Sequence, residues 1–160
     1  MPGLSFVFVG RMKEPHFEAA FAEYMKRLGG YAKCELREIA EQRLGEKPSE
    51  REIAAALERE AREIERVIPR GAYLCAMCVE GEQRSSEELA KLFRELDSRG
   101  VGRICFLVGG SYGLDAALKG RADLRLSMSR MTFPHHLARV MLAEQAYRAF
   151  TINAGKRYHK

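Results

Sequence analysis

The decisive stretch of the sequence is RICFLVGGSYGL, residues 103–114, in which an apolar run leads into a glycine-rich turn. The run is rich in β-branched, aliphatic and aromatic residues, which is typical of a strand buried on both faces. Gly109, Gly110 and Gly113 follow it, and a backbone without Cβ atoms bends sharply and admits a close ligand. Ligands of open parallel α/β sheets bind beyond the carboxyl ends of the strands. The turn is therefore a candidate ligand loop, although an ordinary structural turn accounts for it equally well.

Strand-like and helix-like segments alternate on both sides of this stretch. Ser49 with Glu52, and Ser85 with Glu88, have the spacing of a capping box, which predicts a helix start after each serine. Alternation of this kind predicts a single α/β domain over residues 1–160 with a largely parallel sheet. Strands are expected at residues 5–9, 34–39, 73–79, 103–108 and 124–128, with helices between them and a last helix from Pro134 to about Phe150.

Length and composition exclude several classes of protein. A chain of 160 residues leaves no room for a second domain. With 46% hydrophobic and 31% charged residues, the composition is that of a globular protein rather than a disordered one. No apolar run approaches the roughly 18 residues of a membrane span, and the first residues lack a basic leader with a small-residue cleavage site. We therefore expect a cytoplasmic protein without a membrane anchor.

Positive charge is concentrated at the end of the chain. Residues 119–160 carry nine Lys/Arg against two Asp/Glu, a net charge of +7, whereas the whole chain carries +5. A basic segment on a nearly neutral body suggests a polyanionic partner, because phosphate neutralisation supplies most of the affinity for nucleic acids. Taken alone, a solvated basic helix explains the same charge equally well.

A metal site is not expected. Cys75 and Cys78 have C-x-x-C spacing, but residues three apart in a strand point to opposite faces. His135 and His136 would point about 100° apart on a helix, and no carboxylate or thiol stands at ligand spacing from them. Reduced thiols buried in the core are the preferred interpretation of the cysteines.

A second candidate ligand loop follows the last strand, at residues 127–133, SMSRMTF. Met128, Met131 and Phe133 could enclose an adenine ring while backbone amides contact its edge, or they could simply pack the next helix against the core. Neither this loop nor residues 109–113 matches the G-x-G-x-x-G or G-K-[ST] nucleotide motifs. A dinucleotide-dependent oxidoreductase is therefore disfavoured.

The last helix and the tail carry further polar candidates. Glu144 and Arg148 are four residues apart and share one helix face, as do His135 and Arg139. The final residues would ordinarily be a frayed tail. However, an aromatic ring such as that of Tyr158 stacks on a nucleic-acid base, and an imidazole such as that of the next residue moves a proton near neutral pH.

Together, LVGGSYGL (107–114), LSMSRMTFPHHLARVMLAEQAYRAF (126–150) and the final YHK resemble the RlmH family of the SPOUT superfamily over nearly the whole chain. The combination is specific, although its separate pieces are weak. The resemblance implies a parallel sheet sandwiched by helices, a C-terminal trefoil knot, and a homodimer with the active site at the subunit interface. It also implies methylation of N3 of a pseudouridine in 23S ribosomal RNA, with S-adenosylmethionine as the methyl donor and the ribosome as the setting.

The same resemblance assigns roles to residues. Catalytic roles fall on His135, Glu144, Arg148, Tyr158 and His159, with His159 preferred as the proton acceptor and His135 second. Arg139 corresponds to a polar helix residue of the family, whereas Lys156 and Arg157 are expected to hold phosphates because of their charge; these three are the predicted substrate contacts. A non-catalytic, ribosome-associated RNA-binding protein is the competing interpretation. The cofactor contacts implied are Met77, Gly109, Met128, Ser129, Arg130, Met131, Thr132 and Phe133.

Overall fold

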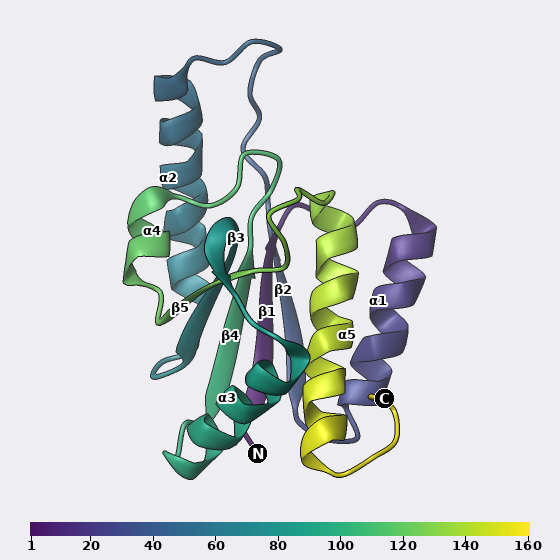
Figure 1. The fold of residues 1–160 in the computed structure, drawn as a ribbon. Helices are drawn as coiled ribbons and strands as arrows, with labels where there is room; N and C mark the ends of the chain where they lie inside the picture. Colours follow the sequence, from purple (N-terminus) through teal and green to yellow (C-terminus); the bar gives the residue numbers. More distant parts are fainter.

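The computed structural model describes residues 1–160 and contains one five-stranded sheet with the strand order β2-β1-β4-β3-β5 (Figure 1). All neighbouring strands are parallel, as the alternation of strands and helices predicted. Their carboxyl ends therefore meet at one edge of the sheet. In chain order the elements are β1 (Gly3–Val9), α1 (Pro15–Leu28), β2 (Cys34–Ile39), α2 (Glu50–Val67), β3 (Tyr73–Gln83), α3 (Ser86–Ser98), β4 (Arg103–Val108), α4 (Ala116–Arg121), β5 (Leu124–Ser127) and α5 (His135–Asn153).

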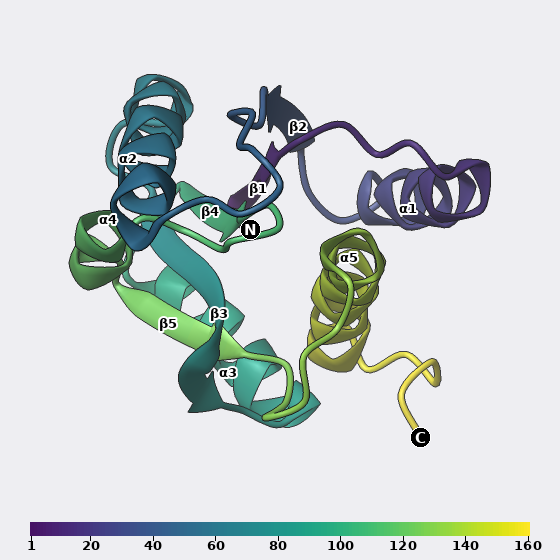
Figure 2. The same cartoon turned by 90° about the horizontal axis from the view of Figure 1, so that it is seen from above.

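Helices cover both faces of the sheet, so the expected sandwich is confirmed (Figure 2). Successive side chains of a strand point to opposite faces. Phe6 and Phe8 of β1 consequently lie in a core shared with α1, α3 and α5. Val7 and Val9 lie in a second core shared with α2 and α4.

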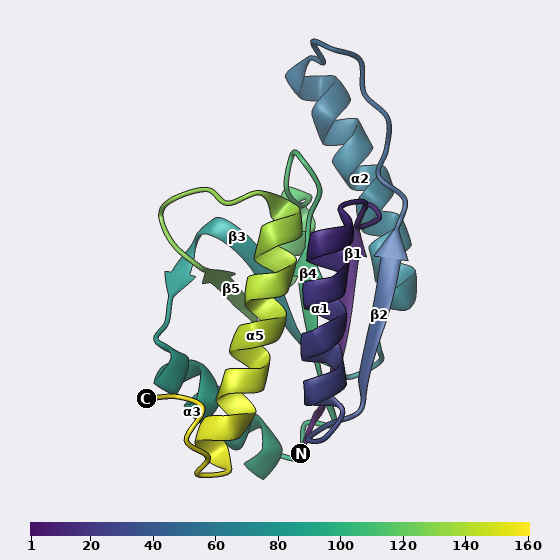
Figure 3. The ribbon, with the colours of Figure 1, turned by 90° about the vertical axis from the view of Figure 1, so that its right-hand side faces the viewer.

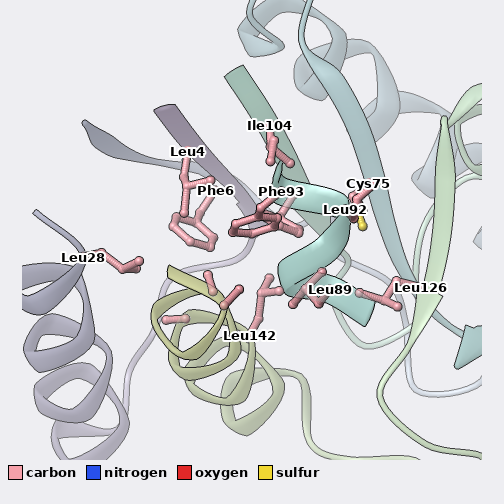
Figure 4. Packing of buried hydrophobic residues seen from close by; sticks show 14 of the residues in the cluster. Leu4, Phe6, Leu28, Cys75, Leu89, Leu92, Phe93, Ile104, Leu126 and Leu142 are labelled. Atoms are coloured by element: carbon pink, nitrogen blue, oxygen red, sulfur yellow. The ribbon is translucent and has the colours of Figure 1, made fainter. Parts of the chain in front are cut away.

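Aromatic rings join the central strands to the helices in the larger core. Phe6 of β1 stacks on Phe106 of β4, with ring centroids 5.6 Å apart. Phe93 of α3 contacts Phe106 at 6.3 Å and Phe150 of α5 at 5.2 Å. Figure 4 shows Phe6, Phe93 and Leu142 within this core. Their packing fixes α5 against the middle of the sheet.

Strand β3 is longer than predicted and continues to Gln83. After a register shift between Met77 and Glu82 it pairs with β5 a second time. Gly81 permits this close approach, because a Cβ at that position would lie 2.7 Å from the carbonyl oxygen of Arg125. The irregular end of β3 thus borders the edge where the ligand loops lie.

The two longest helices are α2 and α5. Ile53 and Leu57 of α2 are only half-buried, because the first half of this helix projects beyond the sheet (Figure 1), whereas Ile64 is buried. Helix α5 ends at Asn153, one turn later than predicted. Neither helix, nor any other in the structure, is long and apolar enough to cross a membrane.

The four cysteines are free thiols. Cys75 and Cys105 are buried on opposite faces of the sheet. Burial raises the pKa of the Cys105 thiol to about 12 and that of the Cys34 thiol to about 11, so both stay protonated and weakly nucleophilic. No cluster of three or more His, Cys, Asp or Glu side chains is arranged to hold a metal ion.

The capping box predicted for α3 is present and provides a stability test. Ser85 Oγ accepts a hydrogen bond from Glu88 N at 3.1 Å, and Ser85 N donates to Glu88 Oε2 at 2.7 Å. Ser85→Ala removes the first bond and should lower the free energy of unfolding by about 1 kcal/mol in urea denaturation. Ser98→Ala is the matched control, because this exposed serine donates only to Arg94 O, and it should change stability by less than about 0.5 kcal/mol. Equal losses in the two variants would contradict the capping role.

Candidate functional site

A cavity of about 700 Å³ lies at the carboxyl edge of the sheet, enclosed by the loops that follow β3, β4 and β5. Its position and volume are those of a ligand site in an open α/β sheet. Arg130, one of the predicted contacts, is exposed and does not line it. The candidate residues that the cavity brings together are Met77, Gly109, Met128, Ser129, Met131, Thr132, Phe133 and His135.

The glycine loop after β4 closes into a tight hairpin. Gly110 and Gly113 form an antiparallel bridge, and Gly113 has a φ of +80°, a conformation that favours glycine. A Cβ at Gly109 would lie 2.9 Å from Gly113 Cα and closer still to its carbonyl group. Of the two explanations that the sequence left open, the structural one therefore applies to Gly109, because the backbone of the loop itself requires a glycine there.

Glu41, in the β2–α2 loop, supports this hairpin and was missed by the sequence analysis. Its Oε1 atom accepts a hydrogen bond from Ser111 N at 3.2 Å, and its carboxylate lies 2.8 Å from where a Cβ of Gly110 would be. The carboxylate thus fills the space that Gly110 leaves open. No motif marks Glu41, because its partner lies 70 residues further along the chain.

The loop after β5 is held by its own serines and surrounded by exposed apolar groups. Ser127 Oγ donates to Ser129 O at 2.8 Å, and Met131 N donates to Ser129 Oγ at 3.0 Å. The Met131 side chain is 73% exposed and that of Tyr112, across the cavity, is 48% exposed. Large apolar side chains left open around a cavity are typical of a surface that a ligand or partner covers.

His135 occupies the start of α5 at the wall of the cavity. Burial, followed by the charges of His136 and Arg139, lowers the pKa of the His135 imidazole. His135 is therefore neutral near pH 7 and has a lone pair available to accept a proton. The adjacent His136 already has a hydrogen-bond partner, because its Nδ1 atom lies 2.6 Å from Glu14 Oε2.

Arg139 lies inside the protein rather than on an exposed face of α5. Its side chain is fully buried, 4.8 Å above the ring of Phe8, and its Nη2 atom donates to Val9 O at 2.5 Å. Its Nε and Nη1 atoms are buried without hydrogen-bond partners. In a single chain the residue therefore faces the end of β1 rather than solvent, and the substrate contact expected of it stays a prediction.

The C-terminal tail folds back onto α5 rather than fraying, contrary to the expectation from composition. Tyr158 Oη donates to Glu144 Oε1 at 3.1 Å, and the Arg148 guanidinium lies 4.8 Å from the centre of the Tyr158 ring. Arg148 also pairs with Glu144. His159 Nδ1 lies 3.1 Å from Arg148 Nη1, and its Nε2 lies 2.8 Å from Glu87 Oε1. Four predicted catalytic residues thus form one group, the tail cluster: Glu144, Arg148, Tyr158 and His159.

The tail cluster is separate from the cavity within one chain. None of its four residues lines the cavity, although Glu144 borders a smaller one of about 470 Å³ that also reaches Met128. In Figure 3 the C terminus lies beside the lower half of α5, whereas the loops after β4 and β5 lie at the upper end. Lys156 and Arg157 are exposed in the turn that leads to the tail. A single chain therefore presents the predicted site in two parts.

The lowered pKa of His135 leads to a prediction for stability. The folded protein binds fewer protons than the unfolded chain at pH values just below the ordinary histidine pKa of 6.5. Stability is therefore lost as the pH falls from about 7 towards 5. His135→Gln should lose less stability than the wild type over this interval, measured by urea denaturation at each pH. The lowered pKa of Glu14 acts in the same direction but is retained in both proteins. Parallel losses would show that His135 does not titrate in this way.

Comparisons with known proteins agree with this geometry. The model of the family described as predicted SPOUT methyltransferases matches residues 3–159. A solved probable methylase family protein from Haemophilus influenzae Rd KW20 has a TM-score of 0.61 and 13% identity, covering 99% of this chain and 71% of that one. A probable methyltransferase from Bordetella pertussis Tohama I has a TM-score of 0.58 and 17% identity, covering 93% and 96%. At such identities the two structures show a shared fold.

Relatives at higher identity narrow the class. A protein from Bifidobacterium adolescentis named ribosomal RNA large subunit methyltransferase H is 44% identical over 160 residues, covering 98% of this chain and 99% of that protein. A protein of the same name from Clostridioides difficile strain 630 is 43% identical over 157 residues, with the same coverage. The chain belongs to the SPOUT methyltransferases and, within them, to the RlmH family.

Proposed function

We propose that this protein uses S-adenosylmethionine to methylate N3 of a pseudouridine in 23S ribosomal RNA, with the ribosome in the cytoplasm as its substrate. The observation that carries the proposal is the convergence of three loops on one cavity in a chain that belongs to the RlmH family. The relatives named above are ribosomal RNA large subunit methyltransferases. The net charge of +7 over residues 119–160 suits an RNA substrate.

The residues of the cavity fit the proposed cofactor. Met128, Met131 and Phe133 offer apolar surface to an adenine ring, and the glycine hairpin after β4 leaves backbone groups accessible without side chains. The cofactor supplies an activated methyl group, so no covalent nucleophile is needed from the protein. Cys78 lies in the cavity wall, but burial raises the pKa of its thiol, which keeps it protonated.

The protein's remaining tasks are to orient the base, exclude water and take the proton from N3. In this proposal Tyr158 orients the base and His159 accepts the proton, with His135 as the second candidate. Arg148 stabilises the negative charge that develops on the flanking carbonyl oxygens. Glu144 holds both Arg148 and the Tyr158 hydroxyl in place. Lys156 and Arg157 contact phosphates.

The proposal includes a homodimer, which the separation of the tail cluster and the cavity supports. Since one chain keeps the two parts apart, a second copy would bring its tail to the cavity of the first. The exposed apolar side chains of Val79, Tyr112 and Met131 around the cavity suit coverage by such a partner. The proposal also includes the C-terminal trefoil knot of the family. The chain leaves the edge strand β5 and returns as α5, which contacts both α1 and α3.

The decisive experiment combines ligand binding with methyl transfer. A thermal shift with S-adenosylhomocysteine should raise the melting temperature and NAD should not, since a ligand at 100 times its Kd stabilises by about 2.7 kcal/mol. Labelled S-adenosylmethionine and ribosomes that lack the modification should then give one N3-methylpseudouridine in 23S RNA, located by mass spectrometry. RNA binding without cofactor binding would instead identify a non-catalytic RNA-binding protein.

A further inference from the structure

A second cavity, of about 680 Å³, adjoins the first at the carboxyl edge of the sheet. The two share Ser111, Tyr112 and His135, so the glycine hairpin and the start of α5 form a common wall. The other walls of this second cavity are the β1–α1 turn and the β2–α2 loop. A molecule that occupied it would lie directly beside the proposed cofactor.

The second cavity is rich in free cations. Arg11, Lys13 and Arg43 line it, against the single carboxylate of Glu41. That carboxylate accepts a hydrogen bond from Ser111 N. All three cationic residues are exposed, and none of them forms a salt bridge within the chain, in contrast to Lys119 and Arg121 of α4, which pair with Glu80 and Glu65.

The walls of the second cavity are fixed by buried or bonded carboxylates. Glu60 of α2 is 4% exposed, and its Oε2 atom accepts from Gln42 N at 2.7 Å, which ties down the β2–α2 loop. Glu38 Oε2 accepts from Met12 N at 3.1 Å, which ties the β1–α1 turn to the end of β2. Because both anchors use backbone amides, the cationic side chains between them remain available for a ligand.

We infer that this second cavity is the RNA subsite, in which Arg11, Lys13 and Arg43 bind the phosphates that flank the nucleotide to be methylated. The inference rests on the proposed function and deepens it, because none of these residues belongs to the basic C-terminal segment. Phosphate contacts position a nucleic acid without reading its sequence. The base of that nucleotide would then lie against the common wall. There it can stack on the exposed ring of Tyr112 and contact the imidazole of His135.

The first test neutralises two of the cations. The double variant Arg11→Gln/Arg43→Gln is compared with Arg70→Gln/Arg99→Gln, which changes two exposed arginines at the opposite, amino-terminal edge of the sheet. Methyl transfer to ribosomes is measured over a range of KCl concentrations. Loss of two phosphate contacts should reduce the slope of log(kcat/KM) against log[salt] by roughly 1.4–1.8. KM should rise about tenfold or more with little change in kcat, since uniform binding is lost.

The second test fills the cavity without removing any charge. Gly45 lies in its wall, a Cβ added there would meet no atom within 4 Å, and its φ is not positive, so a large side chain is accommodated. Gly45→Trp should therefore raise KM for ribosomes, whereas its affinity for S-adenosylhomocysteine should match that of the wild type. Gly102→Trp is the matched control, because Gly102 has equally open surroundings and precedes β4 at the opposite edge.

The outcomes separate this inference from the proposed function. Higher KM in both second-cavity variants, with wild-type cofactor affinity and unaffected controls, supports the RNA subsite. Wild-type KM and salt dependence in those variants overturn the subsite and leave the methyltransferase proposal intact. A wild-type protein that transfers no methyl group to ribosomes overturns the proposed function, and the subsite falls with it.

Discussion

Gly109→Ala is expected to lower the affinity for S-adenosylmethionine by at least about 100-fold, because a displacement of the binding loop by about 1 Å has effects of this size. The added methyl group would overlap the backbone of Gly113, so the hairpin after β4 would have to open. Gly109 and Gly113 cannot move apart without breaking the bridge between Gly110 and Gly113. Isothermal titration calorimetry measures the loss directly.

Gly102→Ala is the control for this substitution, because a Cβ at Gly102 meets no atom within 4 Å. Circular dichroism and urea denaturation establish that both variants are folded before affinities are compared. Unchanged cofactor affinity in folded Gly109→Ala protein would remove the hairpin from the cofactor site. The proposed function would then lose its main structural support.

Deletion of Tyr158–Lys160 is expected to leave cofactor binding intact and to lower methyl transfer by roughly 10²–10⁴, the usual contribution of a general base and its neighbours. The cavity should retain its ligand because no tail residue lines it. Single-turnover rates on ribosomes measure the loss of transfer. His159→Ala should reproduce most of the loss, and a higher pH should partly restore the rate by ionising N3 without help. A normal rate in the truncated protein would transfer the proton-accepting role to His135 or to solvent.

Mixing two inactive proteins tests whether the tail acts across a dimer. Gly109→Ala protein keeps its tail, and the tail-deleted protein keeps its cavity. If each active site combines one cavity with the partner's tail, random exchange of subunits should restore about one quarter of wild-type activity, because half of the dimers are mixed and each has one complete site. No recovery after verified subunit exchange would show that the tail acts on the cavity of its own chain.

The secondary structure could be predicted from local patterns because local forces decide it. All five strands were predicted, and Ser85 with Glu88 correctly marked the start of α3. Burial on both faces of a parallel sheet makes such strands conspicuous in a sequence. The convergence of the ligand loops was also predictable, since the carboxyl ends of parallel strands meet at one edge.

Side-chain contacts between residues far apart in the sequence could not be predicted in this way. Arg139 has the spacing of an exposed polar residue, but its guanidinium is buried against Phe8 and Val9, more than 100 residues earlier in the chain. Glu41 looks like an ordinary loop residue until it meets Ser111. The order of the tail likewise depends on side-chain pairing with α5 and Glu87, which no local composition reveals.

The central position of β1 has a consequence for synthesis of the protein on the ribosome. One edge of β1 pairs with β2, but the other pairs with β4, from Gly3 with Arg103 onward. At about 5–20 residues per second, roughly 5–20 s of translation separate the first strand from its second neighbour. During that interval the apolar segment SFVFV has one unpaired edge that other chains could join. We therefore expect nascent chains of this protein to be most prone to aggregation until residue 108 has left the exit tunnel.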